Sequence, residues 1–200
     1  MIYINKYEKV IIIKKLNPKW TKNGYIMRLG KVEESEKYYD EFISKLDSES
    51  IRMTGSRTDF RKEEVVEFYT KSVNEEDRYD FIIINPEGEI IGESVINEID
   101  FELKSAHFRI GISSSNNRGK GIGTWAIEET VNFAFGDLKL HRLSLEVFSF
   151  NERAKKAYLK AGFKIEGVLR DSILDDGKYA DIIAMAILED EWKTKYREKN

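Results

Sequence analysis

The chain has 200 residues, of which 41% are hydrophobic and 34% are charged, and its formal net charge is −3. This length suits a single domain, and the hydrophobic content is enough to build a sizeable core. The near balance of acidic and basic residues argues against a nucleic-acid partner held by bulk electrostatics. Because the sequence has no cysteine and only two histidines, it excludes disulfides, thiolate metal sites and a cysteine nucleophile, and we expect no metal.

The first 24 residues are expected to be an extension outside the main domain. Their longest aliphatic run, Val10 to Ile13, has the composition of a strand and lysines on both sides. It is too short for the apolar part of a signal peptide or for a membrane span. We therefore expect a cytoplasmic protein with no membrane partner, with a domain at residues 25–190 and a C-terminal tail at 191–200.

The first half of the domain alternates between extended and helical patterns. Residues 25–29 are expected to form a short strand, and apolar residues at helical spacing predict helices over 33–46 and 62–73. Between these two helices, residues 51–60 have no clear periodicity and are expected to be irregular.

The second half of the domain contains most of the expected strands. Extended patterns cover residues 79–85, 90–99, 106–112, 141–148, 162–169 and 179–188, and helical patterns cover 121–135 and 151–160. The turn residues Asp175-Asp176-Gly177 join the last two strands as a hairpin. The resulting order, β-β-β-α-β-α-β-β, predicts an α+β fold.

A glycine-rich loop, Arg118-Gly119-Lys120-Gly121-Ile122-Gly123-Thr124, stands between an apolar strand and an amphipathic helix. Its alternate glycines leave the backbone N–H groups uncovered, and the helix behind them places partial positive charge at its N-terminus. Arg118 and Lys120 add full positive charge. The loop therefore predicts an anion site, and a phosphate group is the most plausible anion.

The spacing of this loop disagrees with two common phosphate loops. A P-loop requires G-x-x-x-x-G-K-[ST], whereas the lysine here lies between glycines. A dinucleotide loop requires G-x-G-x-x-G, whereas the spacing here is G-x-G-x-G and the chain continues into an antiparallel-looking meander. A glycine-rich turn that binds no ligand is a further alternative.

A third loop pattern is R-x-x-G-x-G/A, which binds the pyrophosphate of coenzyme A in the GNAT acetyltransferases, and Arg118, Gly121 and Gly123 match it. The stretch NERAKKAYLKAGFKIEG, at residues 151–167, also resembles that family's signature N-x-x-A-x-x-x-Y-x-K-x-G-F. The resemblance covers residues 25–190 and is nearest to the branch with ribosomal-protein N-terminal and spermidine acetyltransferases. It implies the GNAT acyl-CoA N-acyltransferase fold, a mixed and largely antiparallel central sheet flanked by helices.

The resemblance also implies direct transfer of an acetyl group from acetyl-CoA, as cosubstrate, to an amine acceptor. An N–H near Ile112 would stabilise the oxyanion, Tyr158 would act as general acid toward the thiolate, and Asn151 would bind the pantetheine arm. The coenzyme contacts that it implies are Gly111, Ile112, Ser113, Arg118, Gly119, Lys120, Gly121, Ile122, Gly123, Thr124, Asn151, Ala154 and Tyr158. Simpler interpretations are a core tyrosine at 158 and a helix-capping asparagine at 151.

The residue that acts as general base in the family cannot be assigned to a matching position in this chain. Many relatives carry a glutamate on the strand before the loop, in a pattern like A-E-I-G, whereas this chain reads AHFRIGI, with His107 or Arg109 in that region. Glu93, on the preceding strand, is our first candidate for the base. His107 is another, because an imidazole titrates near neutral pH. Glu98 is a further candidate for the base, and deprotonation of the amine through water is a further alternative.

The acceptor pocket is expected among the two N-terminal helices, residues 51–60 and the last strand pair. Acidic runs at 33–36 and 75–77 could attract a cation, although such runs are more often solvated helix faces. A protein N-terminus, a polyamine, an aminoglycoside-like antibiotic and an amino-acid metabolite all remain open as acceptors. The rival function from a different class is a non-catalytic sensor or scaffold that binds acyl-CoA. A homodimer is expected by analogy with the family.

Overall fold

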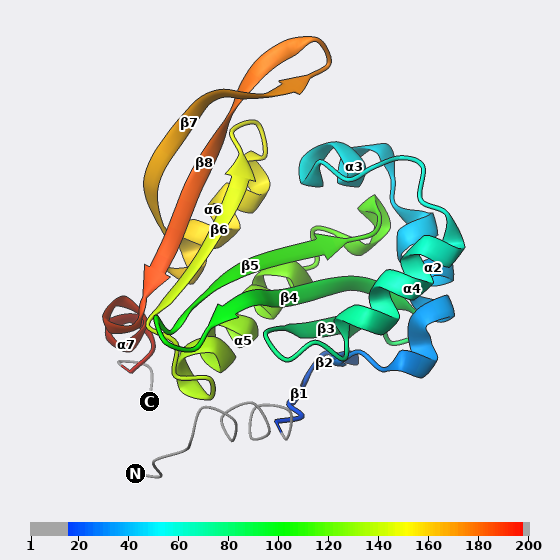
Figure 1. Ribbon diagram of the computed structural model, residues 1–200, viewed down its shortest axis with the longest axis horizontal. Coiled ribbons are helices and arrows are strands. Elements are labelled where there is room, and N and C mark those ends of the chain that lie inside the picture. The colour runs from blue at the N-terminus through cyan, green and yellow to red at the C-terminus, as the bar shows by residue number, and fades with distance from the viewer. Residues whose placement is uncertain (1–15, 198–200) are drawn as a thin grey trace.

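The computed structural model describes residues 16–197, so the expected strand at Val10 to Ile13 lies outside the described residues. Within the described range, an eight-stranded sheet forms the middle layer and α-helices cover its two faces (Figure 1). The expected α+β fold is confirmed.

The sheet is mixed and almost entirely antiparallel. Its strands are β1 (Lys19–Lys22), β2 (Tyr25–Leu29), β3 (Tyr79–Ile84), β4 (Ile90–Asp100), β5 (Ser105–Ile112), β6 (Arg142–Phe148), β7 (Lys164–Asp175) and β8 (Lys178–Leu188). They lie in the order β1-β2-β3-β4-β5-β6-β8-β7, and β5 with β6 is the parallel pair among them. The expected turn between β7 and β8 is confirmed, because Asp176 and Gly177 have the positive φ angles, 50° and 76°, that a two-residue hairpin turn requires.

Three helices, α5 (Ile122–Gly136), α6 (Glu152–Ala161) and α7 (Glu189–Arg197), pack around the larger hydrophobic core. Phe81, Phe108 and Phe133 lie at its centre and are at most 1% exposed. A buried hydrogen bond of 2.7 Å between the hydroxyls of Ser94 and Thr130 links β4 to α5. These contacts fix the position of α5, and hence of the glycine loop before it, relative to the sheet.

The opposite face carries α2 (Ser35–Glu41) and α4 (Lys62–Ser72), which Figure 1 shows over the β2–β4 half of the sheet. The rings of Tyr38 and Tyr69 stack with their centroids 4.3 Å apart. They pack on Ile82, Ile84 and Ile90 in a second, smaller core. The two helices are thereby held beside β4, where the first candidate base lies.

The helix expected over residues 33–46 is divided into η1 (Val32–Glu34), α2 and η2 (Ile43–Lys45). The side chain of Glu34 accepts a hydrogen bond from Arg28 of β2 at 2.9 Å and one from the Lys31 N–H at 3.2 Å. These contacts hold the first turn against the sheet as a separate element.

The expectation of irregular structure over residues 51–60 was wrong at its start, where α3 (Ser48–Thr54) lies. Asp47 caps this helix by accepting the Ser50 N–H at 2.7 Å, and Gly55 ends it with a φ of 65°. A helix of seven residues is too short to show a periodic apolar face, so the two caps were the available signals.

The expected C-terminal tail at residues 191–200 begins inside α7. The ring of Trp192 stacks on Phe135 at 5.7 Å, and its indole N–H donates to Asn132 at 2.9 Å. These contacts fix α7 on α5 as part of the domain. Likewise, β1 places part of the expected N-terminal extension in the sheet.

Candidate active site

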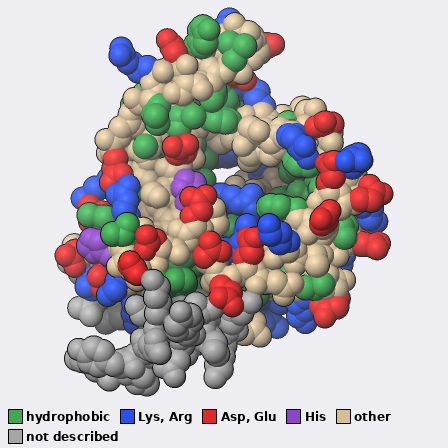
Figure 2. Space-filling model, viewed as in Figure 1, with side chains coloured by type: hydrophobic (Ala, Val, Ile, Leu, Met, Phe, Trp, Pro, Cys, Tyr) green, Lys and Arg blue, Asp and Glu red, His purple; other side chains and the backbone are tan. Residues whose placement is uncertain are grey.

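Strands β5 and β6 lie side by side only at their starts. Their pairing begins at Ser105 and ends at His107, which is opposite Ser144. Beyond that point β5 stays on β4 as far as Ile112, while β6 stays on β8 as far as Phe148. Figure 1 shows the two strands diverging, and Figure 2 shows an opening through the molecule at that place.

The divergence leaves one edge of β5 without a strand partner among the described residues from Phe108 onward. The Ser113 N–H donates to the carbonyl of Ile91, in β4, at 2.9 Å. Because successive N–H groups of a strand point to opposite edges, those of Ile110 and Ile112 point away from β4, toward the opening. An extended ligand that carries amides can add to such an edge as a further strand.

The glycine loop forms the N-terminus of α5. Gly119 and Gly121 have φ angles of 78° and 77°, which residues with a Cβ rarely adopt. A Cβ added at Gly119, Gly121 or Gly123 would meet no atom within 4 Å, so this backbone faces open space. The first N–H groups of the helix add partial positive charge. Backbone geometry of the kind that binds a phosphate is therefore present.

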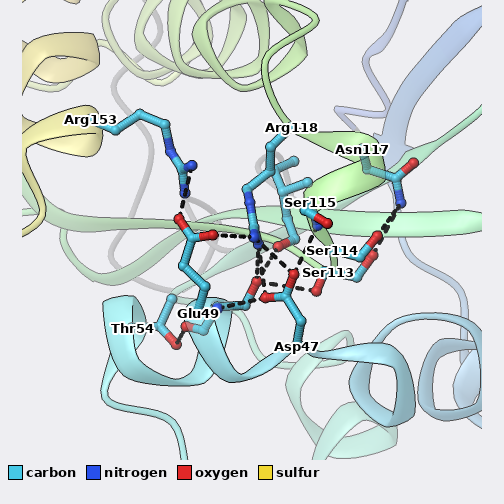
Figure 3. A network of polar contacts seen from close by, with 11 residues as sticks. Asp47, Glu49, Thr54, Ser113, Ser114, Ser115, Asn117, Arg118 and Arg153 are labelled. Carbon is cyan, nitrogen blue, oxygen red and sulfur yellow. Dashed lines mark hydrogen bonds and ion pairs between the residues drawn. The ribbon is translucent and has the colours of Figure 1, made fainter.

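The side chain of Arg118 points to α3 and away from the glycine loop (Figure 3). Its terminal nitrogens donate to both carboxylate oxygens of Asp47, at 3.0 and 2.8 Å, to Glu49 at 2.8 Å and to the Ser50 hydroxyl. Only 9% of the side chain is exposed. The charge that we expected Arg118 to add to the anion site is thus matched by two carboxylates, and Lys120 is the remaining, exposed cation of the loop.

Tyr158 lies on α6 beneath the diverging strands and is 6% exposed. Its ring packs edge-on against Phe108 of β5 and against Phe163. Burial raises the pKa of Tyr158 well above its usual value of 10, so the phenol stays protonated and can act as a donor. Among the described residues, its hydroxyl has no hydrogen-bond partner.

Asn151 is the N-cap of α6, as the simpler interpretation predicted. Its Oδ1 accepts the Ala154 N–H at 3.1 Å, and its Nδ2 donates to the carbonyl of Met53, in α3, at 3.1 Å. The oxygen of the amide therefore caps α6, and its nitrogen ties that helix to α3. Contact of Asn151 and Ala154 with the pantetheine arm stays a prediction.

Glu93 lies directly opposite Gly111 in the pairing of β4 with β5. Its side chain is 13% exposed, accepts the Tyr38 hydroxyl at 2.7 Å and forms an ion pair with Arg109 at 3.3 Å. A Cβ at Gly111 would lie 3.3 Å from Phe42 and 4.0 Å from the Glu93 side chain. The glycine thus keeps free the space between this carboxylate and the end of β5.

His107 lies on the same sheet face as Glu93 but at the closed end of the opening, opposite Asn97 and Ser144. Gly111 lies four residues farther along the strand, which is roughly 13 Å at the usual rise per residue. Glu98 lies farther still, at the bulge between β4 and β5, and accepts from its neighbour Asn97 at 3.1 Å. Of the three candidate bases, the structure brings Glu93 next to Gly111 and Ile112.

A cavity of about 550 Å³ lies between α3, the end of β6 and the turn of the β7–β8 hairpin. Arg52 of α3 donates to both oxygens of Asp175, at 2.9 and 2.7 Å, and lies 4.5 Å from the centre of the Phe150 ring. Asp176 and Asp181 also line the cavity. The acceptor pocket was expected among these elements, but Arg52 was missed because its partner is 123 residues away.

Residues 27–164 match the family model of the acetyltransferase (GNAT) domain. The spermidine N(1)-acetyltransferase of Escherichia coli strain K12 is 30% identical over 134 residues, which are 67% of this chain and 71% of that protein. The spermidine N(1)-acetyltransferase of Vibrio cholerae is 29% identical over 130 residues, which are 65% of this chain and 75% of that protein. A crystal structure of the Vibrio cholerae spermidine N-acetyltransferase in complex with CoA and spermine has a TM-score of 0.75 at 23% identity, and the match covers 86% of this chain and 99% of that one.

The chain belongs to the GNAT acetyltransferase family. It is an N-acetyltransferase that uses acetyl-CoA to acetylate an amine, so the catalytic interpretation is confirmed over that of a non-catalytic sensor. Residues 16–197 contain no group of three or more His, Asp or Glu side chains that could hold a metal ion. No helix in that range is long and apolar enough to cross a membrane.

Replacing Gly123 by valine should weaken acetyl-CoA binding while leaving the fold intact. Gly123 lies in the first turn of α5, where an added Cβ meets no atom within 4 Å. The added Cβ therefore meets no protein atom, and we expect the larger valine side chain to crowd the phosphate beside the N–H groups of the loop. We expect the Kd for acetyl-CoA, measured by isothermal titration calorimetry, to rise by at least about tenfold.

The matched control is Gly167→Val in β7, where an added Cβ also meets no atom within 4 Å. This variant should bind acetyl-CoA like the wild type. Unchanged binding by the folded Gly123→Val variant would mean that the loop does not hold the coenzyme.

Proposed function

We propose that the chain acetylates a primary amine of a polyamine such as spermidine, with acetyl-CoA bound in the opening between β5 and β6. The observation that carries the proposal is the continuity of the unpaired β5 edge with the glycine loop at α5, with Tyr158 packed beneath the same strand. An extended chain of amides that ends in a pyrophosphate fits a strand edge that leads to a helix N-terminus.

In this proposal the donor binds mainly to backbone. The N–H groups of Ile110 and Ile112 pair with the pantetheine amides and the thioester, and those of residues 119–124 hold the pyrophosphate. When the amine attacks the thioester carbon, negative charge gathers on its oxygen, and the Ile112 N–H stabilises it. As the carbon–sulfur bond breaks, the Tyr158 hydroxyl hydrogen-bonds the departing sulfur and supplies its proton.

Glu93 is the group that we propose as the base. An alkyl ammonium has a pKa near 10.4, yet the amine must be neutral to attack. The Glu93 carboxylate lies opposite Gly111, the residue before Ile112, and can take the proton directly or through one water. His107 is at the other end of β5 and is not placed for this step.

Several acidic groups support a polyamine as the acceptor. A polyamine carries several ammonium groups, and Asp176 and Asp181 line the cavity beside the opening, whereas the charge of Asp175 is matched by Arg52. The net charge of −3 favours the approach of a cation. Similarity to two spermidine acetyltransferases supports the same choice. A protein N-terminus, whose α-amine has a pKa near 7.7–8.0 and needs less help from a base, is the main competing acceptor.

The expected homodimer stays a prediction. The edge strand β7 supports it, because Ile165, Val168 and Leu169 are about half exposed there and could pack against a second chain.

Spermidine should be a better acceptor than peptides with free N-termini, by at least about tenfold in kcat/KM. The measurement is release of coenzyme A with a panel of spermidine, peptides, an aminoglycoside and free amino acids under matched conditions. A preference for peptides would contradict the polyamine proposal. Absence of release with every amine, despite bound acetyl-CoA, would contradict all of these acceptors.

Tyr158→Phe should lower kcat by about a hundredfold or more while leaving acetyl-CoA affinity unchanged, because the ring packing is kept and only the hydroxyl is lost. Steady-state rates and calorimetric Kd values separate the two effects. The control is Tyr196→Phe, whose hydroxyl donates to the Ala161 carbonyl at 3.0 Å, away from the opening. An unchanged kcat in Tyr158→Phe would remove this residue as the acid.

In Glu93→Gln, the reaction rate should depend on the fraction of the acceptor amine that is already unprotonated in solution. Near pH 7 the variant should be slower by about a hundredfold, and its kcat/KM should rise about tenfold per pH unit toward the amine pKa. The wild type should instead reach a plateau at lower pH. Initial rates over a pH series test this, with Glu98→Gln as a control that keeps the wild-type profile. Parallel profiles for wild type and Glu93→Gln would exclude Glu93 as the base.

A further inference from the structure

Every terminal N–H of Arg118 is used within the protein. Those of Nη1 go to Asp47, at 3.0 Å, and to the Ser50 hydroxyl, and those of Nη2 go to Asp47 and Glu49, both at 2.8 Å. The remaining donor, Nε–H, is buried without a partner among the described residues. Arg118 could bind a phosphate only by leaving α3, which would uncover two carboxylates.

Asp47 lies at the centre of this cluster (Figure 3). In addition to Arg118, its carboxylate accepts the N–H of Ser115 at 2.8 Å, across 68 residues of sequence, and its own N–H donates to the Ser113 carbonyl at 3.1 Å. These contacts reach Ser113, Ser115 and Arg118, which all belong to segment 113–118, the connection from β5 to the glycines of the loop. Asp47 therefore holds this segment at three points.

Ser50 adds a second tie to the same segment. Its hydroxyl lies 3.0 Å from the carbonyl of Ile112 and 3.1 Å from that of Ser113, and the residue is 4% exposed. Hydrogen bonds from Arg118, Ser50 and Ser115 hold the pKa of the Asp47 carboxyl well below its usual range. Because the pKa is lowered, the carboxylate stays ionised at every pH above the ordinary value near 3.9. The cluster therefore persists throughout the pH range of an assay.

We infer that Asp47 is a positioning residue for the coenzyme, and that Arg118 acts with it to hold the loop rather than to touch the pyrophosphate. This inference rests on the proposed function, because it concerns the same loop. Segment 113–118 joins the thioester position near Ile112 to the pyrophosphate position at residues 119–124. With α3 holding this segment, the N–H groups at its two ends are arranged before acetyl-CoA arrives.

The test is Asp47→Asn, which removes the charge and places an NH2 group against the N–H donors of Ser115 and Arg118. We expect the Kd and KM for acetyl-CoA to rise by roughly tenfold, because buried donors lose their acceptor. At saturating acetyl-CoA, kcat should stay near the wild-type value, because the reacting groups are untouched. Arg118→Met should have the same effect, and the double variant should be little weaker than either single variant.

The control is Glu166→Gln, which breaks an exposed ion pair of the same kind, with Arg142, far from the loop. It should leave the acetyl-CoA Kd unchanged. If Asp47→Asn does not fold, Ser50→Ala removes only the hydroxyl tie and should raise the Kd by roughly threefold.

The inference is overturned if Asp47→Asn, or Ser50→Ala in its place, binds acetyl-CoA as tightly as the wild type. Binding lost in Arg118→Met but kept or improved in Asp47→Asn would make Arg118 a direct ligand that Asp47 restrains, which also overturns it. Gly123→Val separates this failure from that of the proposed function. If Gly123→Val binds acetyl-CoA as tightly as the wild type, the loop itself is misassigned. If Gly123→Val binds more weakly while Asp47→Asn binds normally, only the role of Asp47 is rejected.

Discussion

The parallel contact between β5 and β6 ends at His107, and the rest of the site depends on this. Each of the two strands is held along its length by its own antiparallel partner, β4 or β8, so neither can turn back to the other. The result is a strand edge with N–H groups that face an opening in the middle of the sheet. The glycine loop continues that edge, and Tyr158 packs on Phe108 beneath it.

Helix α3 links the two sides of this opening. It is tied to the β5 side through Arg118, to α6 through Asn151 and to the hairpin turn through Asp175. A helix of seven residues would not be stable alone, so these contacts also determine that it forms. Because a partly buried ion pair recovers little more than the cost of desolvating its charges, the Asp47–Arg118 pair is better explained by the geometry that it fixes than by stability.

The sequence predicted what local patterns encode. The fold could be predicted from strand and helix periodicity from Tyr79 onward and from the Asp176-Gly177 turn. The acyl donor could be predicted from the family signature around Tyr158. The sequence could not predict the partner of Arg118, because Asp47 is 71 residues away and a guanidinium before a glycine loop reads equally well as a phosphate ligand. Similarly, the proximity of Glu93 to Gly111 follows from the register of two strands, which no single segment contains.

Amide hydrogen exchange, with and without acetyl-CoA, tests most directly whether the coenzyme lies along the open edge of β5. Binding there should slow exchange at Ile110, Ile112 and residues 119–124, because their N–H groups become donors to the pantetheine arm and the pyrophosphate. The remaining strands should change little. Protection confined to other segments, such as the turn of the β7–β8 hairpin, with no change along β5, would contradict this placement of the coenzyme.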